Sequence, residues 1–413
     1  MTHVDDLAGE LDRLLAAADA DLATRYPGDR GVRQPVHTVY VPADRFAAGT
    51  VREWASQAKD VLGEAPTGLT EALDLPAELG AELHRRVRAK LEREPIEDLR
   101  IDFEDGYGTR PDEQEDAAAV DAARALAKTV GDGTATPYHG LRIKSLEAPS
   151  RRRGLRTLDL FIREFAGALT DGFVITLPKV TSVEQVEAML VVLSTIEQAN
   201  NLPAESLKFE IQIETPQAIL GPDGSALVAR MIHAGSGRVT GLHYGTYDYS
   251  ASLGVAAAYQ SMDHPVADHA KDVMQLAAAG TGVFVSDGST NVLPVGDREA
   301  VHAAWRLHFG LVRRSLARGI YQGWDMHPAQ LPTRYAATYL FYREGLNTAG
   351  ARLRAYVGGG NSGYLDEPAT AAALAGYVLR GLECGAVAPA EVDELIGVDT
   401  AGLAKLARRP VRS

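Results

Sequence analysis

The stretch LRIDFEDGYGTR, residues 99–110, alternates apolar and polar positions and then breaks at two glycines. It places Asp102, Glu104 and Asp105 within four positions, at the point where the apolar pattern stops. Acidic side chains rarely lie at the end of a buried strand without a partner. The pattern therefore indicates a strand followed either by a solvated turn or by one wall of a reaction site.

Seven other runs share these features, being apolar over a few residues and ending in polar, Gly or Pro residues. The eight runs span residues 35–42, 98–105, 140–145, 172–179, 208–215, 238–245, 282–288 and 319–328. Segments such as 182–201 and 297–319 lie between them and have the three- and four-residue apolar spacing of helices. Eight strands, each followed by a helix, predict an α/β fold, a closed (β/α)₈ TIM barrel. A doubly wound sheet is the alternative, but no GxGxxG motif follows the first run.

The regions outside this alternation predict additional parts. We expect a helical extension over residues 1–30, a barrel over 31–330 and a helical cap or oligomerisation segment over 331–413. Residues 43–97 read as a helical insertion within the barrel.

Composition narrows the class of protein. The 413 residues are 46% hydrophobic and 23% charged, which is typical of a folded soluble enzyme. A net charge of −13 argues against a nucleic-acid partner. A single cysteine, Cys384, excludes an internal disulfide and a cysteine-rich metal site. The N-terminus is unlike a secretory signal, and no apolar run approaches the roughly 18 residues of a membrane span, so we expect a cytoplasmic protein with no membrane partner.

The active site of a TIM barrel lies at the C-terminal ends of its strands. The polar residues that end the eight runs are Asp102, Glu104, Asp105, Arg142, Lys144, Lys179, Glu214, Asp248, Asp287 and His327. Most of them are carboxylates that would repel one another. A bound divalent cation is the simplest way to neutralise such a group.

Glu214 and Asp248 follow two successive strands, so one carboxylate from each strand end would meet at the barrel mouth. Two such oxygen ligands with open positions suit Mg²⁺ or Mn²⁺. The spacing leaves another interpretation equally open, in which Glu214 caps the following helix and Asp248 is a turn residue.

The cations have alternative roles too. Arg142 and Lys144 are two apart and are expected to point the same way along one strand. An arginine there can clamp a substrate carboxylate or an enolate oxygen, and a salt bridge to Asp102 or Glu104 is compatible with that role. Lys179 fits a catalytic amine but is more simply a structural partner of the acids, and His327 could instead satisfy backbone groups at the barrel mouth.

Taken in order, the strand ends resemble the HpcH/HpaI aldolase and citrate lyase β-subunit superfamily. The motifs that carry the resemblance are VYVPADRF, IDFEDGYG, LRIKS, LPKVTS, IETPQAI, GTYDYSASLG, VSDG and GWDMHPAQ. Single motifs of this kind are weak, whereas eight in the correct order across about 36–330 are strong.

The resemblance implies a TIM-barrel lyase or aldolase in which Glu214 and Asp248 hold Mg²⁺, with Mn²⁺ as an alternative. Arg142 would clamp a 2-oxo acid and stabilise the enolate oxygen, while Glu104 and Asp105 would orient metal-bound waters or Arg142. Further substrate contacts are expected from Lys179, Gly245, Thr246, Asp287 and His327.

The implied reaction is reversible aldol or Claisen-type cleavage of a small hydroxy or oxo acid, or of its acyl-CoA thioester, releasing a 2-oxo acid such as glyoxylate or pyruvate. Two alternatives stay open: a condensing enzyme of the malate synthase kind, and a non-catalytic regulatory barrel that binds a metabolite. The retained Glu214, Asp248 and Arg142 argue against the regulatory barrel.

Beyond the barrel, GYLDEPATAAALAG (363–376) resembles a segment of the malyl-CoA and citramalyl-CoA lyase branch. In that branch the C-terminal part caps a neighbouring subunit's site and presents an aspartate there, which corresponds to Asp366. We therefore expect a homo-oligomer, a trimer or hexamer. From the residues alone, Asp366 reads as a helix N-cap.

This sequence departs from the acyl-CoA branch at several cations. His37 replaces a basic residue before the first motif, no lysine follows until Lys59, and Trp324 stands where the last motif has lysine. Because these cations would bind the CoA diphosphate, the use of CoA is uncertain and the chain is a divergent relative.

Overall fold

The computed structural model describes residues 3–360, 363–364 and 366–409, so the outermost residues of both expected terminal segments lie outside it. Its eight parallel strands form one sheet in the order β7-β6-β5-β4-β3-β2-β1-β8. The strands are β1 (His37–Pro42), β2 (Asp98–Asp102), β3 (Tyr138–Arg142), β4 (Phe173–Leu177), β5 (Lys208–Ile213), β6 (Val239–Tyr244), β7 (Phe284–Ser286) and β8 (Gly323–Asp325). Each lies within or beside one of the expected runs, and most end two or three residues earlier.

The sheet closes between its first and last members. Ser286 and Gln322 form a parallel bridge, and the Asp287 amide donates to the Gln322 carbonyl at 2.9 Å. Further along the same two segments, the Trp324 amide donates to the Gly288 carbonyl at 3.1 Å. The prediction of a (β/α)₈ TIM barrel is thus confirmed.

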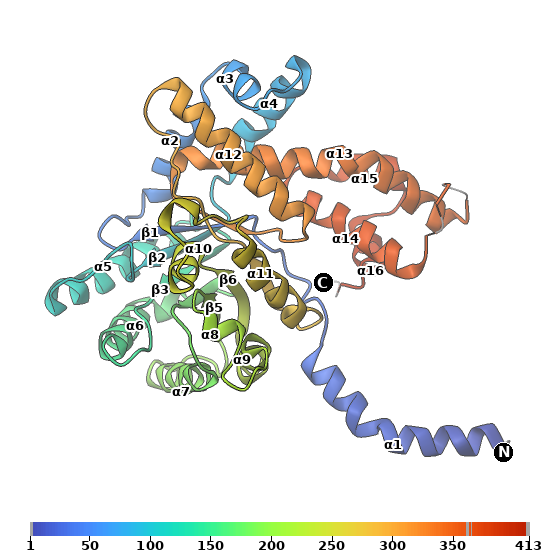
Figure 1. Cartoon of the computed structure of the whole chain (residues 1–413), viewed down its shortest axis with the longest axis horizontal. Coiled ribbons are helices and arrows are strands. Elements are labelled where there is room, and N and C mark those ends of the chain that lie inside the picture. The colour runs from blue at the N-terminus through green and yellow to red at the C-terminus, as the bar shows by residue number, and fades with distance from the viewer. Residues whose placement is uncertain (1–2, 361–362, 365, 410–413) are drawn as a thin grey trace.

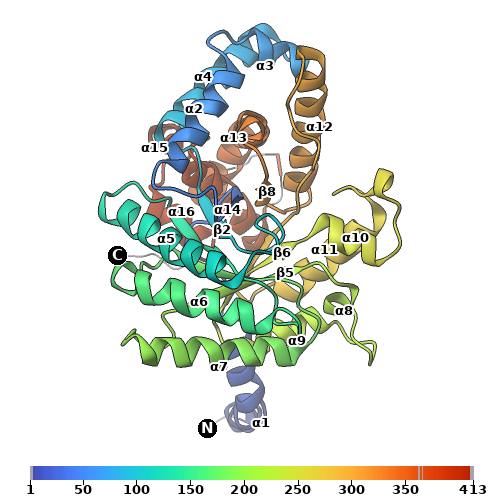
Figure 2. The ribbon, with the colours of Figure 1, turned by 90° about the vertical axis from the view of Figure 1, so that its left-hand side faces the viewer.

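Helices surround the barrel, and further helices extend beyond it at both ends of the chain (Figures 1 and 2). Those associated with the barrel are α5 (Asp112–Gly131), α6 (Arg151–Phe165), η1 (Ala166–Ala168), α7 (Val183–Ala199), α8 (Pro216–Ile219), α9 (Leu227–Ala234), α10 (Thr246–Ser252), η2 (Ala257–Tyr259), α11 (Pro265–Ala278) and α12 (Arg298–Ala317).

Three helices, α2 (Thr50–Leu62), α3 (Thr67–Ala72) and α4 (Ala77–Arg93), lie between β1 and β2. After β8 come η3 (Pro328–Gln330), α13 (Leu331–Gly358), α14 (Pro368–Cys384), α15 (Pro389–Ile396) and α16 (Thr400–Leu406). Helix α1 (His3–Arg25) projects away from the body in both views (Figures 1 and 2). In the part of the chain that the structure describes, no helix is long and apolar enough to cross a bilayer.

The strands alternate apolar residues outward and polar residues inward. Ile101, Leu141 and Ile211 are fully buried in the hydrophobic core between the barrel and its helices. The intervening positions carry charge: Arg100 donates to both oxygens of Glu210, at 3.2 and 3.1 Å, inside the barrel. Most TIM barrels fill this layer with branched apolar side chains. Here a buried polar layer divides the C-terminal end of the barrel from the N-terminal end.

Candidate active site

A cavity of about 450 Å³ opens at the C-terminal ends of the strands. Its lining comes from the ends of β1, β2, β3, β5 and β8, from the first turn of α10 with Gly245 before it, and from the loop after β7. The residues are Tyr40, Pro42, Arg45, Asp102, Asp105, Gly106, Arg142, Gln212, Glu214, Gly245, Thr246, Tyr247, Asp248, Ser289, Trp324 and Met326. Its volume lies in the range of small-molecule sites.

Strand register builds the back of this cavity. Asp102 and Arg142 are partners across β2 and β3, so their side chains lie next to each other inside the barrel. Arg142 forms a bidentate salt bridge with Asp102, in which Nε and Nη2 each donate to a carboxylate oxygen at 2.7 Å. Burial acts to lower the pKa of Arg142, but the Asp102 carboxylate holds that pKa well above its ordinary value. The arginine is therefore a fixed cation, and the predicted salt bridge is confirmed.

Two aromatic rings cover Arg142. Its guanidinium carbon lies 4.8 Å from the centre of the Tyr40 ring and 5.3 Å from that of Trp324. The two ring centres are 4.3 Å apart, so the pair forms a continuous wall. Cations are attracted to such ring faces, most strongly where water is excluded. The wall orients Arg142 and narrows the cavity on the β1–β8 side.

Lys179 lies among the acids at the mouth. Its Nζ donates to Glu104 at 2.5 Å and to Asp105 at 2.9 Å, and lies 3.5 Å from Asp248. Burial opposes the lysine charge, but the Glu214 and Glu104 carboxylates raise its pKa above the ordinary value. Its φ of 52° is uncommon for a residue with a side chain. The ammonium is the cation around which these acids gather.

Glu214 is buried, and hydrogen bonds hold both of its carboxylate oxygens. One oxygen accepts from the Lys179 amide at 2.7 Å, and the other accepts from Gln212 Nε2 at 2.8 Å. Burial raises the pKa of Glu214 to about 8, even though the Lys179 charge acts in the opposite direction. A Cβ at Gly245 would lie 2.6 Å from the Glu214 Cβ, so glycine is required there for Glu214 to hold this position.

Glu104 and Asp105 differ in their titration. Burial raises the pKa of Glu104, and the neighbouring Asp105 charge raises it further, against the effect of Arg142. The pKa of Asp105 is lowered, because hydrogen bonding and charge from Lys179 outweigh its burial. Lys179 thus contacts three acids at once, Glu104, Asp105 and Asp248.

The oxygen donors at this mouth are of the type that Mg²⁺ and Mn²⁺ take. Within residues 3–360, 363–364 and 366–409, however, no three acidic, histidine or cysteine side chains form a ready metal-binding group. The physical reason lies in Lys179, which contacts the acids that a metal would need, and in the two hydrogen bonds to Glu214. The donor chemistry fits a divalent ion once the ammonium moves aside.

The structure brings together most of the predicted site residues. Arg142, Asp105, Glu214, Gly245, Thr246 and Asp248 line the cavity, and Glu104 and Lys179 contact these residues. Lys144 does not join them, and the expectation that it points the same way as Arg142 is wrong. β3 ends at Arg142, and Lys144 turns to Glu115 on α5 at 2.8 Å.

Three predicted residues lie apart from the cavity lining. Asp287 accepts from Lys271 on α11, at 3.0 and 2.9 Å, and from Ser315 on α12 at 2.6 Å. His327 Nδ1 accepts from the Ala329 amide at 3.2 Å and caps η3, as its backbone-satisfying alternative predicts.

Asp366 pairs with Arg352 of α13, whose Nε lies 3.2 Å from a carboxylate oxygen. This contact is made within the C-terminal helices of the same chain, away from the cavity lining. A contribution of Asp366 to another subunit's site stays a prediction.

Gln212, Tyr40 and Trp324 are among the lining residues that were not predicted from the sequence as parts of the site. Gln212 lies two residues before Glu214, so strand alternation predicts that both face inward. Tyr40 and Pro42 are also two residues apart and both line the cavity, but a tyrosine in an apolar run reads as a core residue. Trp324 stands where the family motif has lysine, and its contact with Arg142 depends on barrel closure.

A family profile described as a domain of unknown function, DUF6986, matches residues 15–411. The chain belongs to this family. No curated protein matches the sequence.

Among solved structures, a magnesium/glyoxylate complex of malate synthase from Haloferax volcanii is similar, with 14% identity and a TM-score of 0.50. The match covers 93% of this chain and 99% of that one. A lead(II) complex of the same enzyme gives 15% identity and a TM-score of 0.50 over 75% of this chain and 74% of that one. An HpcH/HpaI aldolase/citrate lyase family protein from Burkholderia cenocepacia J2315 gives 14% identity and a TM-score of 0.41 over 76% and 96%. At these identities the malate synthase likeness shows the barrel fold alone.

Proposed function

We propose that this protein is a Mg²⁺-dependent carbon–carbon lyase or aldolase that cleaves a small hydroxy or oxo acid, or its acyl-CoA thioester, and releases a 2-oxo acid such as glyoxylate or pyruvate. The observation that carries the proposal is the excess of carboxylates at the barrel mouth: Glu104, Asp105, Glu214 and Asp248 surround Lys179, with Arg142 behind them. Such an excess calls for a second positive charge.

Glu214 and Asp248 are the residues that would hold the ion. Both present carboxylate oxygens on the cavity wall. Burial raises the pKa of Glu214 most, and the Glu104 and Asp248 charges raise it further. When bound, Mg²⁺ supplies Lewis-acid polarisation of a carbonyl oxygen and a template for the carboxylate next to it.

The remaining residues bind and orient the substrate. Lys179, released from the acids, offers three donors to a substrate carboxylate at the mouth. Arg142, fixed by Asp102, places a positive charge where negative charge develops on the enolate oxygen. Tyr40 and Trp324 exclude water from that side of the cavity.

Glu104 and Asp105 are the acids left to position protons. Glu104 accepts a hydrogen bond from Lys179 and lies 3.4 Å from Arg142 Nη1. A substrate or ion bound at the mouth would therefore change the protonation of Glu104. We propose that the two acids orient water molecules and Arg142 during the reaction. Asp366 of a neighbouring subunit would then act as the acid or base in a trimer or hexamer.

The reaction direction has two candidates. The likeness to a malate synthase magnesium/glyoxylate complex covers nearly all of both chains, which supports a condensing enzyme as the alternative. Measuring the equilibrium from both sides separates a lyase from a synthase. A panel of free hydroxy acids and CoA thioesters, assayed for glyoxylate, pyruvate or oxaloacetate, decides the substrate.

The test of the proposal uses Glu214→Gln and Asp248→Asn, with Asp223→Asn as a matched control. Asp223 is an exposed aspartate that pairs with Arg230 at 3.3 Å, outside the cavity lining. We expect 2-oxo acid release to depend on Mg²⁺ in the wild type and the control, and to be lost in the two site variants. Full activity in both site variants would show that the metal assignment is wrong.

A further inference from the structure

Helix α1, which we call the N-terminal arm, takes no part in the proposed active site. It projects from the body in both views (Figures 1 and 2), and every side chain from Val4 to Arg25 is exposed. None of the arm residues that the structure describes belongs to the hydrophobic core. Most of a helix's stability in a folded protein comes from packing its apolar face against another element. The apolar face of the arm is therefore open to a partner outside the chain.

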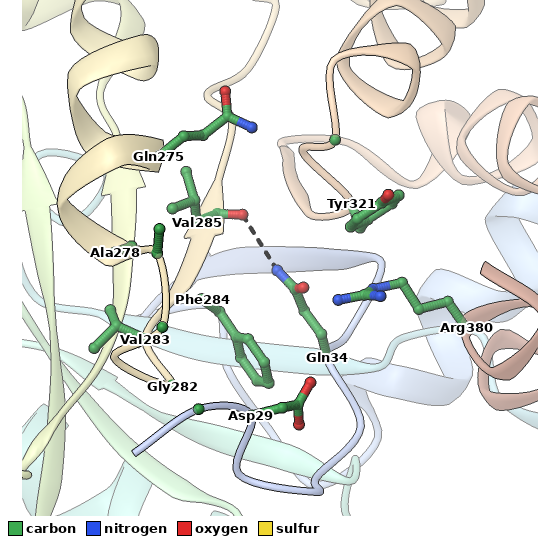
Figure 3. Close-up of a pocket in the computed structure, with 14 residues that line it drawn as sticks. Asp29, Gln34, Gln275, Ala278, Gly282, Val283, Phe284, Val285, Tyr321 and Arg380 are labelled. Carbon is green, nitrogen blue, oxygen red and sulfur yellow. Dashed lines mark hydrogen bonds between the residues drawn. The ribbon is translucent and has the colours of Figure 1, made fainter. Parts of the chain in front are cut away.

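The base of the arm is fixed to the barrel. The Gly28 amide donates to the Gly280 carbonyl at 2.8 Å, and Gly28 has a φ of 84°, which glycine adopts readily. Asp29 pairs with Arg409 at 3.1 Å. Gly28 and Asp29 line a hollow of about 280 Å³ beside the end of α11 (Figure 3). A hollow of this size suits a small molecule, so it is not where a second helix would pack.

The apolar residues of the arm form one continuous stripe. They recur in alternating steps of four and three residues: Val4, Ala8, Leu11, Leu15, Ala18 and Leu22. Val4 is 70% exposed and Leu22 is 59% exposed, so neither end of the stripe is covered. These steps are those of the two core positions of a coiled-coil heptad. A helix with this spacing fits best against a second helix with the same spacing, because each side chain then inserts between side chains of the facing helix.

The two flanks of the stripe differ in character. Leu7 and Leu14 border it on one side and are 48% and 74% exposed. The other side carries Asp5, Asp12 and Asp19. In an antiparallel pair of arms the two aspartate flanks would meet, and like charges repel. In a parallel pair the leucine flank of one arm meets the aspartate flank of the other, so the charge distribution selects the parallel arrangement.

Charge and length also limit the kind of partner. The arm carries six acids against two arginines, so an anionic lipid surface or a nucleic acid would repel it. Its 23 residues span about 34 Å. One side of a stable protein interface typically contributes about 20–30 residues. A second arm offers a contact of that size with a matching spacing along its whole length.

We propose that the N-terminal arm is an oligomerisation element that packs in parallel against the same arm of a second copy of this chain, along the Val4–Leu22 stripe. Parallel arms place the bodies of the copies at the same end and relate them by a rotation axis along the arms. The contact lies apart from the C-terminal cavity, so it does not depend on the proposed reaction.

The first test compares two double variants of the full-length chain by sedimentation velocity over a range of protein concentrations. Leu11→Glu/Leu15→Glu places two acids in the stripe. Ala16→Glu/Ala20→Glu is the matched control, because it adds the same two acids at the same spacing away from the stripe. We expect the control to self-associate as the wild type does. The stripe variant should need a concentration roughly a hundredfold higher or more, because each buried leucine contributes about tenfold. Circular dichroism verifies that both variants keep their helix content.

The second test fixes the orientation of the arms by cross-linking. Leu15→Cys should form a disulfide between two copies in the presence of dissolved oxygen, because parallel arms bring the two residue-15 Cα atoms within about 7 Å. The two thiols give two electrons and two protons to the oxidant as the Sγ–Sγ bond forms. Ala20→Cys, on the outer face of the arm, should stay unlinked. The wild type should also stay unlinked, because its Cys384 is buried.

The proposal is overturned if the wild type is a monomer at every concentration, or if the stripe variant self-associates as tightly as the control. Equal loss of association in the control would also overturn it, because added charge and not the stripe would then be responsible. An oligomer that Leu15→Cys does not cross-link would mean that the arm packs antiparallel or against another surface, which contradicts the parallel pair. None of these measurements uses turnover, so the proposed lyase function stands or falls separately.

Discussion

The two ends of the barrel differ in how their charged side chains are paired. At the C-terminal end, four carboxylates surround the single ammonium of Lys179. At the N-terminal end, Arg100 pairs with Asp98 and Glu210, and Arg33 pairs with Glu94 and Glu97. The buried Arg100–Glu210 layer lies between the two ends. The comparison teaches that ion pairs between oppositely charged residues satisfy the charges at the N-terminal end, whereas several carboxylates share one lysine at the C-terminal end.

The largest expected effect is the loss of turnover when an acid of the C-terminal mouth is replaced. Glu214→Gln and Asp248→Asn each remove one negative oxygen donor, and each should reduce Mg²⁺-dependent turnover by about 1,000-fold, equivalent to about 4 kcal/mol. The measurement is initial-rate kinetics over a range of Mg²⁺, with circular dichroism to verify the fold. Asp223→Asn should behave as the wild type. A rate within about tenfold of the wild type in both site variants would contradict the assignment.

The next effect is on stability. Arg142→Met leaves Asp102 buried without its bidentate partner, and should lower the free energy of unfolding by about 3 kcal/mol. Denaturant unfolding measures it. The matched control is Arg163→Met, which breaks an exposed pair with Asp159 and should cost less than about 0.5 kcal/mol. Equal costs in the two variants would mean that the Arg142–Asp102 pair does not support the cavity.

A pH dependence sharpens the comparison further. Because burial raises the pKa of Glu214 to about 8, the folded metal-free protein keeps a proton that the unfolded chain loses above its ordinary value of 4.5. The unfolded state thus binds fewer protons over this window, and stability falls as pH rises from about 4.5 to about 8. Relative to Glu214→Gln, the wild type in EDTA should lose about 2.5 kcal/mol of unfolding free energy between about pH 5.5 and about pH 7.5, because each pH unit contributes about 1.4 kcal/mol.

Unfolding free energies measured for the wild type and Glu214→Gln across this pH range supply the check. A difference between the two proteins that does not change with pH would show that Glu214 is ionised throughout. The acidic end would then already be balanced without a second cation.

The smallest effect comes from backbone space. Gly245→Ala places a Cβ 2.6 Å from the Glu214 Cβ, so Glu214 must shift, at a cost of about 1.5 kcal/mol. Gly310→Ala is the control, because no heavy atom lies within 4 Å of its added Cβ on α12. It should be neutral or stabilising. Thermal unfolding in EDTA compares the two, and an unchanged Tm for Gly245→Ala would contradict the close approach.

Much of the fold could be predicted from the sequence because alternating strands and spaced helices are local patterns. The acids of the C-terminal mouth followed from the strand-end rule, which depends only on where each strand stops. Which way a side chain turns just past a strand is decided by tertiary contacts. Asp287 and Lys144 show this, because they turn to Lys271 and Glu115 on neighbouring helices.

Other features could not be predicted because they depend on closure and register. Trp324 meets Tyr40 only when β8 pairs with β1. The cavity of about 660 Å³ at the N-terminal end of the barrel joins strand beginnings to residues 30–35, a segment without regular structure, and no sequence motif marks such a contact. Lys208 in particular begins a strand and reads in sequence as an ordinary surface lysine.

The most direct test of the central claim is the binding of Mn²⁺, followed by electron paramagnetic resonance of the free ion. We expect one Mn²⁺ site per chain in the wild type and in Lys208→Met, and loss of that site in Asp248→Asn and Glu214→Gln. Equal Mn²⁺ binding in the wild type and both site variants would contradict it, because the excess of acid at the C-terminal mouth would then not be what holds the ion.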